Sequence, residues 1–145
     1  MFTGIISHTQ GYTYSHEEQR VYVERNAFWD NCYVGQSIAV NGVCLTIREL
    51  KPKVVFELSE ETILLTNLAY NSFANFEKPA QIGHDNSGHN VLGHVHTVCT
   101  LEAIEPQDNG HYNLWFHVDD DDSYKLLFKD SVAVNGVSLT IAKKS

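Results

Sequence analysis

The chain has 145 residues, of which 43% are hydrophobic and 19% are charged, and its formal net charge is -8 at pH 7. This balance is typical of a folded globular protein and argues against intrinsic disorder. The acidic excess argues against a nucleic acid or an anionic membrane as partner, because both are recognised by basic patches.

The sequence carries no recognisable targeting signal. No apolar run approaches the roughly 20 residues that span a bilayer, and the first residues lack the basic start and apolar core of a signal peptide. The three cysteines, Cys32, Cys44 and Cys99, are odd in number and show no C-x-x-C spacing. We therefore expect reduced thiols and a cytoplasmic protein.

Short β-strands dominate the predicted secondary structure. Many short strands at this spacing, separated by turn-forming residues, predict an all-β barrel or sandwich. The predicted strands, rich in Val, Ile, Tyr, Phe and Thr, are residues 20–24, 37–47, 53–59, 97–105, 111–118 and 131–141. Short helical turns are predicted at residues 28–32, 60–68 and 123–128, and a solvated hairpin turn at residues 119–122.

One stretch of sequence occurs twice. Residues 37–47 read SIAVNGVCLTI and residues 131–141 read SVAVNGVSLTI. Such a repeat at a fixed offset indicates one supersecondary unit used twice, and its Asn-Gly pair predicts a tight turn or a bulge. The first copy carries a thiol, Cys44, where the second carries a hydroxyl, Ser138. The two units could therefore divide a chemical task between them.

The repeat predicts two units, residues 1–86 and residues 87–145. In the first unit, strand-forming sequence continues after the repeated stretch as far as Lys78, whereas the second copy is followed only by Ala142–Ser145. By internal comparison the second unit lacks its last strands. The missing strands are either absent from a shortened chain or replaced by something else, and both possibilities stay open.

Several polar side chains are candidates for chemistry. Cys44, inside a predicted strand, is either a small buried hydrophobe or a nucleophile. The polar stretch from Glu60 to Asn67 is either the acidic start of a helix or a clamp for a hydroxylated or heterocyclic ligand. The acidic run Asp119–Asp122 lacks the glycine and terminal glutamate of a calcium loop.

Histidines gather in the segment HDNSGHNVLGHVH. Its spacing matches no zinc signature, so we expect no metal there. We expect His89 and His94 to orient polar groups or transfer protons, and His84 and His96 to be ordinary loop and strand residues. The glycine before His89 and the glycine before His94 indicate a close backbone approach, for example by a planar ligand.

Five motifs, in one order, resemble the riboflavin synthase family across essentially the whole chain. They are MFTGII at the N-terminus, SIAVNGVCLT, EETILLTNL, GHNVLGHV and SVAVNGVSLT. The family also contains lumazine proteins and yellow fluorescent proteins, which bind lumazine or flavin without converting it. The resemblance implies tandem six-stranded Greek-key β-barrels that assemble as trimers, with the second barrel incomplete in this chain.

The resemblance also implies an activity. Family members convert two molecules of 6,7-dimethyl-8-ribityllumazine into riboflavin and a diaminouracil by moving a four-carbon unit, without a metal or redox cofactor. One lumazine is held by the N-terminal barrel of one subunit and the other by the C-terminal barrel of another. The alternative is a non-catalytic lumazine- or flavin-binding protein of the same family.

Site residues carry over position by position. The resemblance implies proton-transfer and nucleophile roles for Ser37, Cys44 and His94, with Ser138 acting from a neighbouring subunit. For the first lumazine it implies Phe2, Gly4, Ile5, Ile6, Leu45, Thr46, Glu57, Glu61, Thr62 and Thr66, with His89, Gly93 and Val95 closing the site. For the second lumazine it implies Lys129, Leu139 and Thr140.

Two departures from the family pattern bear on the alternatives. Asn135 stands where the family usually has aspartate, which removes a carboxylate expected at the acceptor site. The second unit also has no counterpart of the EETILLT stretch. These departures favour the binding protein, whereas the presence of Ser37, Cys44, Thr62 and His94 favours the enzyme.

Overall fold

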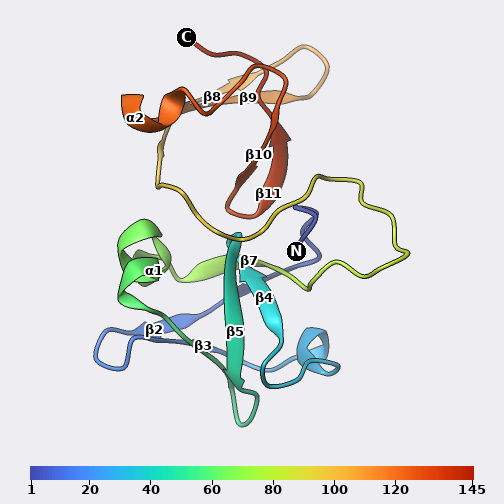
Figure 1. The fold of residues 1–145 in the computed structure, drawn as a ribbon, viewed down its shortest axis with the longest axis vertical. Helices are drawn as coiled ribbons and strands as arrows, with labels where there is room; N and C mark the ends of the chain where they lie inside the picture. Colours follow the sequence, from blue (N-terminus) through green and yellow to red (C-terminus); the bar gives the residue numbers. More distant parts are fainter.

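The computed structural model describes residues 1–145, and it consists mainly of short antiparallel β-strands (Figure 1). The first half contains β1 (His8–Gly11), β2 (Thr13–Ser15), β3 (Arg20–Val23), β4 (Ser37–Val40), β5 (Val43–Glu49), β6 (Val54–Glu57) and β7 (Phe73–Glu77). It also contains the helical segments η1 (Ala27–Trp29), α1 (Glu60–Leu65) and η2 (Leu68–Tyr70). The second half contains β8 (Thr100–Pro106), β9 (Tyr112–His117), α2 (Asp120–Ser123), β10 (Ser131–Val134) and β11 (Val137–Thr140).

The seven strands of the first half form one sheet that nearly closes into a barrel. Their order is β1-β7-β4-β5-β6-β3-β2, so β1 and β2 are the two edges. Only Tyr12 separates β1 from β2 along the chain, so the two edges are parts of one bent segment. The buried Tyr12 hydroxyl donates a hydrogen bond of 2.6 Å to the carbonyl of Leu68. Burial raises the pKa of Tyr12 to about 12. Counting the bent segment once gives the six-stranded barrel that the family resemblance implies.

The barrel interior holds the apolar core. Side chains alternate between the interior and solvent along β3, where Val21 and Val23 are fully buried, as the period of two in a half-buried strand requires. Trp29 is fully buried and lies edge-on to Phe56 and Phe76. No helix has the length and apolar character needed to cross a bilayer.

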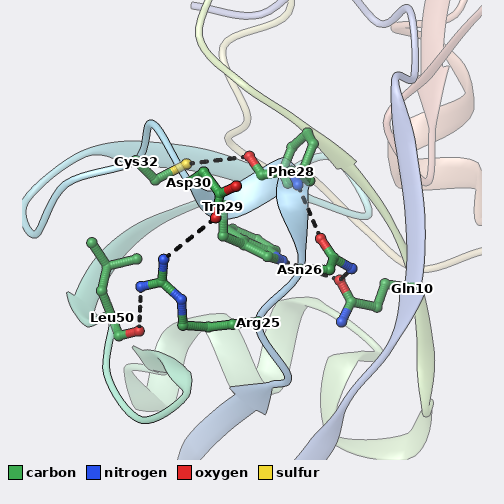
Figure 2. A network of polar contacts seen from close by, with 8 residues as sticks. All are labelled: Gln10, Arg25, Asn26, Phe28, Trp29, Asp30, Cys32 and Leu50. Atoms are coloured by element: carbon green, nitrogen blue, oxygen red, sulfur yellow. Dashed lines mark hydrogen bonds and ion pairs between the residues drawn. The ribbon is translucent and has the colours of Figure 1, made fainter.

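A polar network surrounds Trp29 (Figure 2). The side-chain oxygen of Gln10 accepts hydrogen bonds from the Trp29 indole N–H at 3.1 Å and from the Asn26 amide at 3.0 Å. The Asn26 side-chain oxygen in turn accepts from the backbone N–H of Phe28 and caps η1. Arg25 donates to the carbonyl of Leu50 at 2.9 Å. The buried indole is therefore satisfied, as a buried donor must be.

The second half consists of two hairpins that share no backbone ladder. β8 pairs with β9 and β10 pairs with β11, as separate two-stranded sheets. In the first half, β6 joins β5 to β3, and β7 joins β4 to β1. The second half has no counterparts of β6 and β7 between its hairpins. The two hairpins therefore do not close a second barrel, and large side chains such as Ile104, Tyr112 and Phe128 are exposed.

The two copies of the repeat meet at their turns. Asn41 and Gly42, between β4 and β5, have φ angles of 50° and 78°, and Asn135 and Gly136, between β10 and β11, have φ angles of 48° and 82°. Two successive positive φ angles define a type I′ hairpin turn, which favours Asn-Gly. The predicted tight turn is therefore confirmed. A Cβ on Gly42 would lie 2.6 Å from the backbone nitrogen of Gly136.

The first residues of each half pair with the other half. Phe2 and Val91 form an antiparallel bridge, with hydrogen bonds of 2.7 and 3.0 Å. The carbonyl of Gly4 accepts from the backbone N–H of Ser138 at 2.8 Å, and the carbonyl of Gly93 accepts from that of Cys44 at 2.9 Å. In each proposed unit, residues 1–86 and 87–145, the first residues therefore pair with the other unit. We call these residues, 2–4 and 91–93, the entry segments.

The structure differs from the sequence-based expectation at several elements. The expectation listed no strand at β1 or β2, because their sequences, HTQG and TYS, are largely polar and β1 ends in glycine. The run Asp119–Asp122 is not a hairpin turn. Residues 120–123 form the short helix α2, whose first turn is acidic, and negative charge there is favoured by the helix dipole. The helical turn expected at 123–128 therefore lies earlier in the chain.

The contact between the turns predicts a cost for any side chain at Gly42. Gly42→Ala should lower the free energy of unfolding by about 1–2 kcal/mol for the positive φ and by roughly 1–3 kcal/mol more for overpacking. Gly110→Ala is the matched control, because Gly110 has a φ of 82° but no atom within 4 Å of the added Cβ. Urea denaturation measures both variants. Equal losses would contradict the proposed importance of the contact.

Candidate functional site

A cavity of about 370 Å³ opens beside β5 of the first barrel. Its volume lies in the range of small-molecule sites. The repeated strand supplies one wall, and the end of β6 and the start of α1 supply another. The lining residues are Val34, Gly35, Cys44, Leu45, Thr46, Ile47, Arg48, Glu57, Ser59 and Thr62. Residues from the SIAVNGVCLTI and EETILLTNL motifs therefore converge on one cavity.

The start of α1 forms a polar wall of this cavity. Ser59 caps the helix, because its hydroxyl oxygen accepts from the backbone N–H of Thr62 at 3.1 Å. The Ser59 hydroxyl also lies 3.0 Å from the Thr62 hydroxyl. Thr66, at the end of the helix, donates to the carbonyl of Thr62 at 2.7 Å. The two interpretations of this stretch are thus compatible, since a capped helix N-terminus also lines the cavity.

Glu57 places a negative charge at the cavity. Arg20, its partner in the β3–β6 register, donates to its carboxylate at 2.7 Å, and Arg48 lies 3.6 Å away. The hydrogen bond from Arg20 holds the pKa of the Glu57 carboxyl below its usual value. The carboxylate is therefore an anionic acceptor for hydroxyl or N–H groups of a ligand. Arg20 was not among the residues expected at the site, although opposite charges on two predicted strands were a usable signal.

Cys44 is half-buried on β5 and lines the cavity. Gly93 packs against Cys44, and a Cβ added to Gly93 would lie 2.6 Å from the Cβ of Cys44. At Gly88 a Cβ would lie 2.0 Å from the carbonyl oxygen of Thr3. The expected close backbone approach at these glycines is therefore present. It is made to the protein's own backbone, and the suggested planar ligand is not needed to explain it.

A second cluster forms around Ser138 on β11. The Nδ1 atom of His89 shares a hydrogen bond of 2.6 Å with the Ser138 hydroxyl. The backbone N–H of His89 donates to the carbonyl of Thr3 at 3.0 Å, next to Gly4, which accepts from Ser138. A hydroxyl that shares a hydrogen bond with an imidazole is the arrangement that can activate an oxygen nucleophile or relay a proton.

The hydrogen bonds around the two clusters correspond. The backbone N–H of Gly35 donates to Ile47 at 2.9 Å, and that of Lys129 donates to Ile141 at 2.7 Å. Gly35 and Lys129 both have positive φ angles. Lys129 thus occupies the place that the cavity-lining Gly35 has in the first half. The role implied for Lys129 at the second lumazine site stays a prediction.

The family model described as "Lumazine binding domain" matches residues 3–77 and 92–145. The chain belongs to the lumazine-binding domain family. The two matched segments correspond to the two halves of the structure, and residues 78–91 between them are not matched. The resemblance identified from the motifs is confirmed.

Relatives in this family include riboflavin synthases. The chain is 32% identical to the riboflavin synthase of Escherichia coli strain K12 over 99% of this chain and 71% of that protein. It is also 32% identical to the riboflavin synthase of Bacillus subtilis strain 168, over 97% and 68%. The Saccharomyces cerevisiae riboflavin synthase is 36% identical over 78% of this chain and 49% of that protein.

Solved structures share the lumazine-binding fold. LumP complexed with riboflavin superposes with a TM-score of 0.84 and 21% identity, covering 100% of this chain and 82% of that chain. LumP complexed with 6,7-dimethyl-8-(1'-D-ribityl) lumazine gives a TM-score of 0.84 and 22% identity over the same shares. The all-β fold expected from the sequence is therefore confirmed.

The remaining residues implied by the family resemblance differ in position and burial. Ser37 faces Thr46 in the β4–β5 register, while His94 is exposed and follows Gly93. Phe2, Leu45 and Thr66 are buried, Ile6 and Val95 are half-buried, and Ile5 and Glu61 are exposed. Leu139 and Thr140 continue β11 beyond Ser138. Side chains of His, Cys, Asp and Glu form no group of three or more that could hold a metal ion.

The Arg20–Glu57 pair predicts an acid-dependent part of the stability. The folded pKa of Glu57 is below the unfolded value of about 4.3. At pH values above the unfolded pKa, the Arg20–Glu57 pair makes its full contribution to the free energy of unfolding. As the pH falls, the unfolded chain takes up the proton first, so the contribution is lost. Urea denaturation between about pH 6 and about pH 3 should show that the free energy of unfolding falls more steeply for the wild type than for Glu57→Gln. Parallel curves would contradict the ion pair.

Proposed function

We propose that this chain binds 6,7-dimethyl-8-ribityllumazine in the cavity beside β5 and takes part in the riboflavin synthase reaction. The observation that carries the proposal is the convergence of Cys44, Thr46, Glu57 and Thr62 on that cavity. Cys44, Thr46 and Thr62 come from the motifs that resemble riboflavin synthase, and the relatives named above are riboflavin synthases. Two observations therefore support the proposal: the side chains that line the cavity and the membership of the chain in the family.

The cavity offers groups that suit a ribityllumazine. Thr46 and Thr62 provide hydroxyls, and the Glu57 carboxylate provides an anionic acceptor for ribityl hydroxyls or a ring N–H. Val34 and Leu45 provide apolar surface for a heterocyclic ring. Polar groups at fixed positions orient a small molecule in its site, and apolar wall surface buries it.

The proposed reaction needs a base, a nucleophile and two substrates held together. The methyl group on C7 of lumazine is acidic, because its anion is delocalised into the ring, so a histidine suffices as base. The acceptor lumazine adds a nucleophile at C7, from a thiol, a hydroxyl or water. Riboflavin and the diaminouracil together contain the atoms of two lumazines, so the four-carbon transfer needs no external oxidant or reductant.

The chain has groups for these roles in two places. Cys44 lines the cavity, and Ser37 pairs with the cavity-lining Thr46. His94 follows Gly93 in the chain. Ser138 and His89 form the hydrogen-bonded pair of the second cluster. No hydrogen bond within the chain joins Cys44 to either member of that pair. We propose that the first cavity of one copy faces the Ser138 pair of another, in a homo-oligomer. Holding two rings face to face lowers the entropic barrier.

A second candidate function is binding of lumazine or flavin without turnover. The observation that favours it lies beside Ser138. There the second half has no counterparts of β6 and α1, the elements that supply Glu57 and Thr62 to the first cavity. A lumazine at Ser138 would have fewer polar groups to orient it. The chain would then hold one ligand well and lack the productive partner.

Turnover is the test that separates the two functions. The purified chain is incubated with 6,7-dimethyl-8-ribityllumazine, and riboflavin is followed by its absorbance. We expect one riboflavin for each pair of lumazines consumed, since the four-carbon unit passes from one to the other. A tight fluorescent complex without riboflavin contradicts the enzyme and supports the binding protein. Absence of both binding and turnover contradicts both functions.

Cys44→Ser tests the thiol. It should lower turnover by at least about tenfold, because a nucleophile or proton-transfer group commonly contributes that much or more. The fold should stay intact, because Ser138 occupies the same place in the second copy. Cys32→Ser is the matched control, since Cys32 packs beside Phe28, away from the cavity. A fully active but destabilised Cys44→Ser protein would support the packing interpretation of the thiol.

A further inference from the structure

Glu77, the last residue of β7, is a buried carboxylate with no cation beside it. Its side chain is 6% exposed, and no Lys, Arg or His forms an ion pair with it. A buried carboxylate is costly unless hydrogen bonds satisfy its oxygens. A feature with this cost calls for an explanation beyond barrel packing.

Three hydrogen bonds join Glu77 to the first residues of the chain. One carboxylate oxygen accepts from the backbone N–H of Thr3 at 2.7 Å and from its hydroxyl at 2.8 Å. The other oxygen accepts from the backbone N–H of Gly4 at 3.0 Å. The two carboxylate oxygens thus accept from two successive backbone N–H groups, one oxygen for each N–H. A side chain with one acceptor oxygen could not provide a separate acceptor for each N–H group.

The carbonyls of the same two residues hold the Ser138 cluster. The Thr3 carbonyl accepts from the backbone N–H of His89 at 3.0 Å, and the Gly4 carbonyl accepts from that of Ser138 at 2.8 Å. Glu77 therefore fixes one side of the peptide segment whose other side aligns the hydrogen-bonded His89 and Ser138. The carboxylate belongs to the first barrel, whereas Ser138 belongs to the second half.

We infer that Glu77 is a positioning residue for the His89–Ser138 pair and acts through Thr3 and Gly4. It touches neither the imidazole nor the hydroxyl, so its effect is on their alignment. The catalytic consequence rests on the proposed function, whereas the structural consequence does not. Without the carboxylate, Thr3–Gly4 loses its anchor, and the two backbone acceptors of the pair become mobile.

The first cavity offers an internal control. The carbonyl of Gly93 accepts from Cys44 as that of Gly4 accepts from Ser138. No carboxylate holds the segment Leu92–Gly93, since β7, which carries Glu77, has no counterpart in the second half. Loss of Glu77 should therefore disturb the Ser138 amide and leave the Cys44 amide nearly unchanged.

Hydrogen exchange in the ligand-free protein tests the inference. In Glu77→Gln, which keeps the side-chain shape but leaves fewer acceptors, the Ser138 amide should exchange at least about tenfold faster, as expected for a weakened hydrogen bond. The Cys44 amide should stay within roughly twofold of the wild type. Equal acceleration at both amides, or none at Ser138, overturns the inference.

The imidazole of His89 gives a second readout. Ser138→Ala supplies the NMR signal of a His89 without its partner, and in Glu77→Gln the signal should move toward that reference. Tyr12→Phe is the control for general destabilisation, because it removes the Tyr12–Leu68 hydrogen bond elsewhere in the barrel, and it should leave the His89 signal in place. A wild-type signal in Glu77→Gln overturns the inference.

A folding failure of Glu77→Gln does not remove the test. Thr3→Val deletes the hydroxyl that donates to Glu77 and keeps the β-branched shape. It should produce the same pattern with smaller amplitude, and an unchanged Ser138 amide and His89 signal would overturn the inference. In the turnover assay, Glu77→Gln should lower kcat while lumazine affinity at the first cavity is retained. If the wild type itself makes no riboflavin, the proposed enzyme fails while the exchange experiment still decides the role of Glu77.

Discussion

The backbone N–H groups of Cys44 and Ser138 impose the constraint on which the rest of the structure depends. In each repeated hairpin this N–H points away from the partner strand and needs an acceptor. The acceptor is a glycine carbonyl from the other half, Gly93 for Cys44 and Gly4 for Ser138. At both glycines an added Cβ would collide with the residue that donates the hydrogen bond. The same exchange of entry segments between the two halves produces the Phe2–Val91 bridge and positions His89.

Because the entry segments are exchanged, the two proposed ligand sites are not independent parts. The residue that follows Gly93 is His94, and the peptide before Gly4 receives the backbone N–H of His89. Each site therefore combines a strand from one half with a loop from the other. The two sites are nevertheless unequal, since Cys44 lines a cavity with walls from β6 and α1, whereas Ser138 lies on a hairpin that no further strand covers.

The sequence was sufficient for the parts of the molecule that local patterns encode. The Asn-Gly pairs predicted the turns, since few residues tolerate two successive positive φ angles, and the repeated strand and the EETILLT stretch predicted side chains that share one cavity. Arg20, Thr3 and Glu77 were missed because their roles depend on partners far away in the sequence. The close approach at Gly88 and Gly93 was predicted, but only the fold could show that the approaching atoms belong to the protein.

The exchanged segments also bear on how the chain folds. All seven strands of the first barrel are complete once Glu77 is in place, so most of its ladder can form from residues already available. The carbonyl of Gly4, near the start of the chain, pairs with Ser138, near its end. Contacts between such distant residues form slowly, because the intervening loop must be closed first. During synthesis Gly4 would therefore emerge long before its partner Ser138, and the Ser138 cluster would be completed after the cavity of the first barrel.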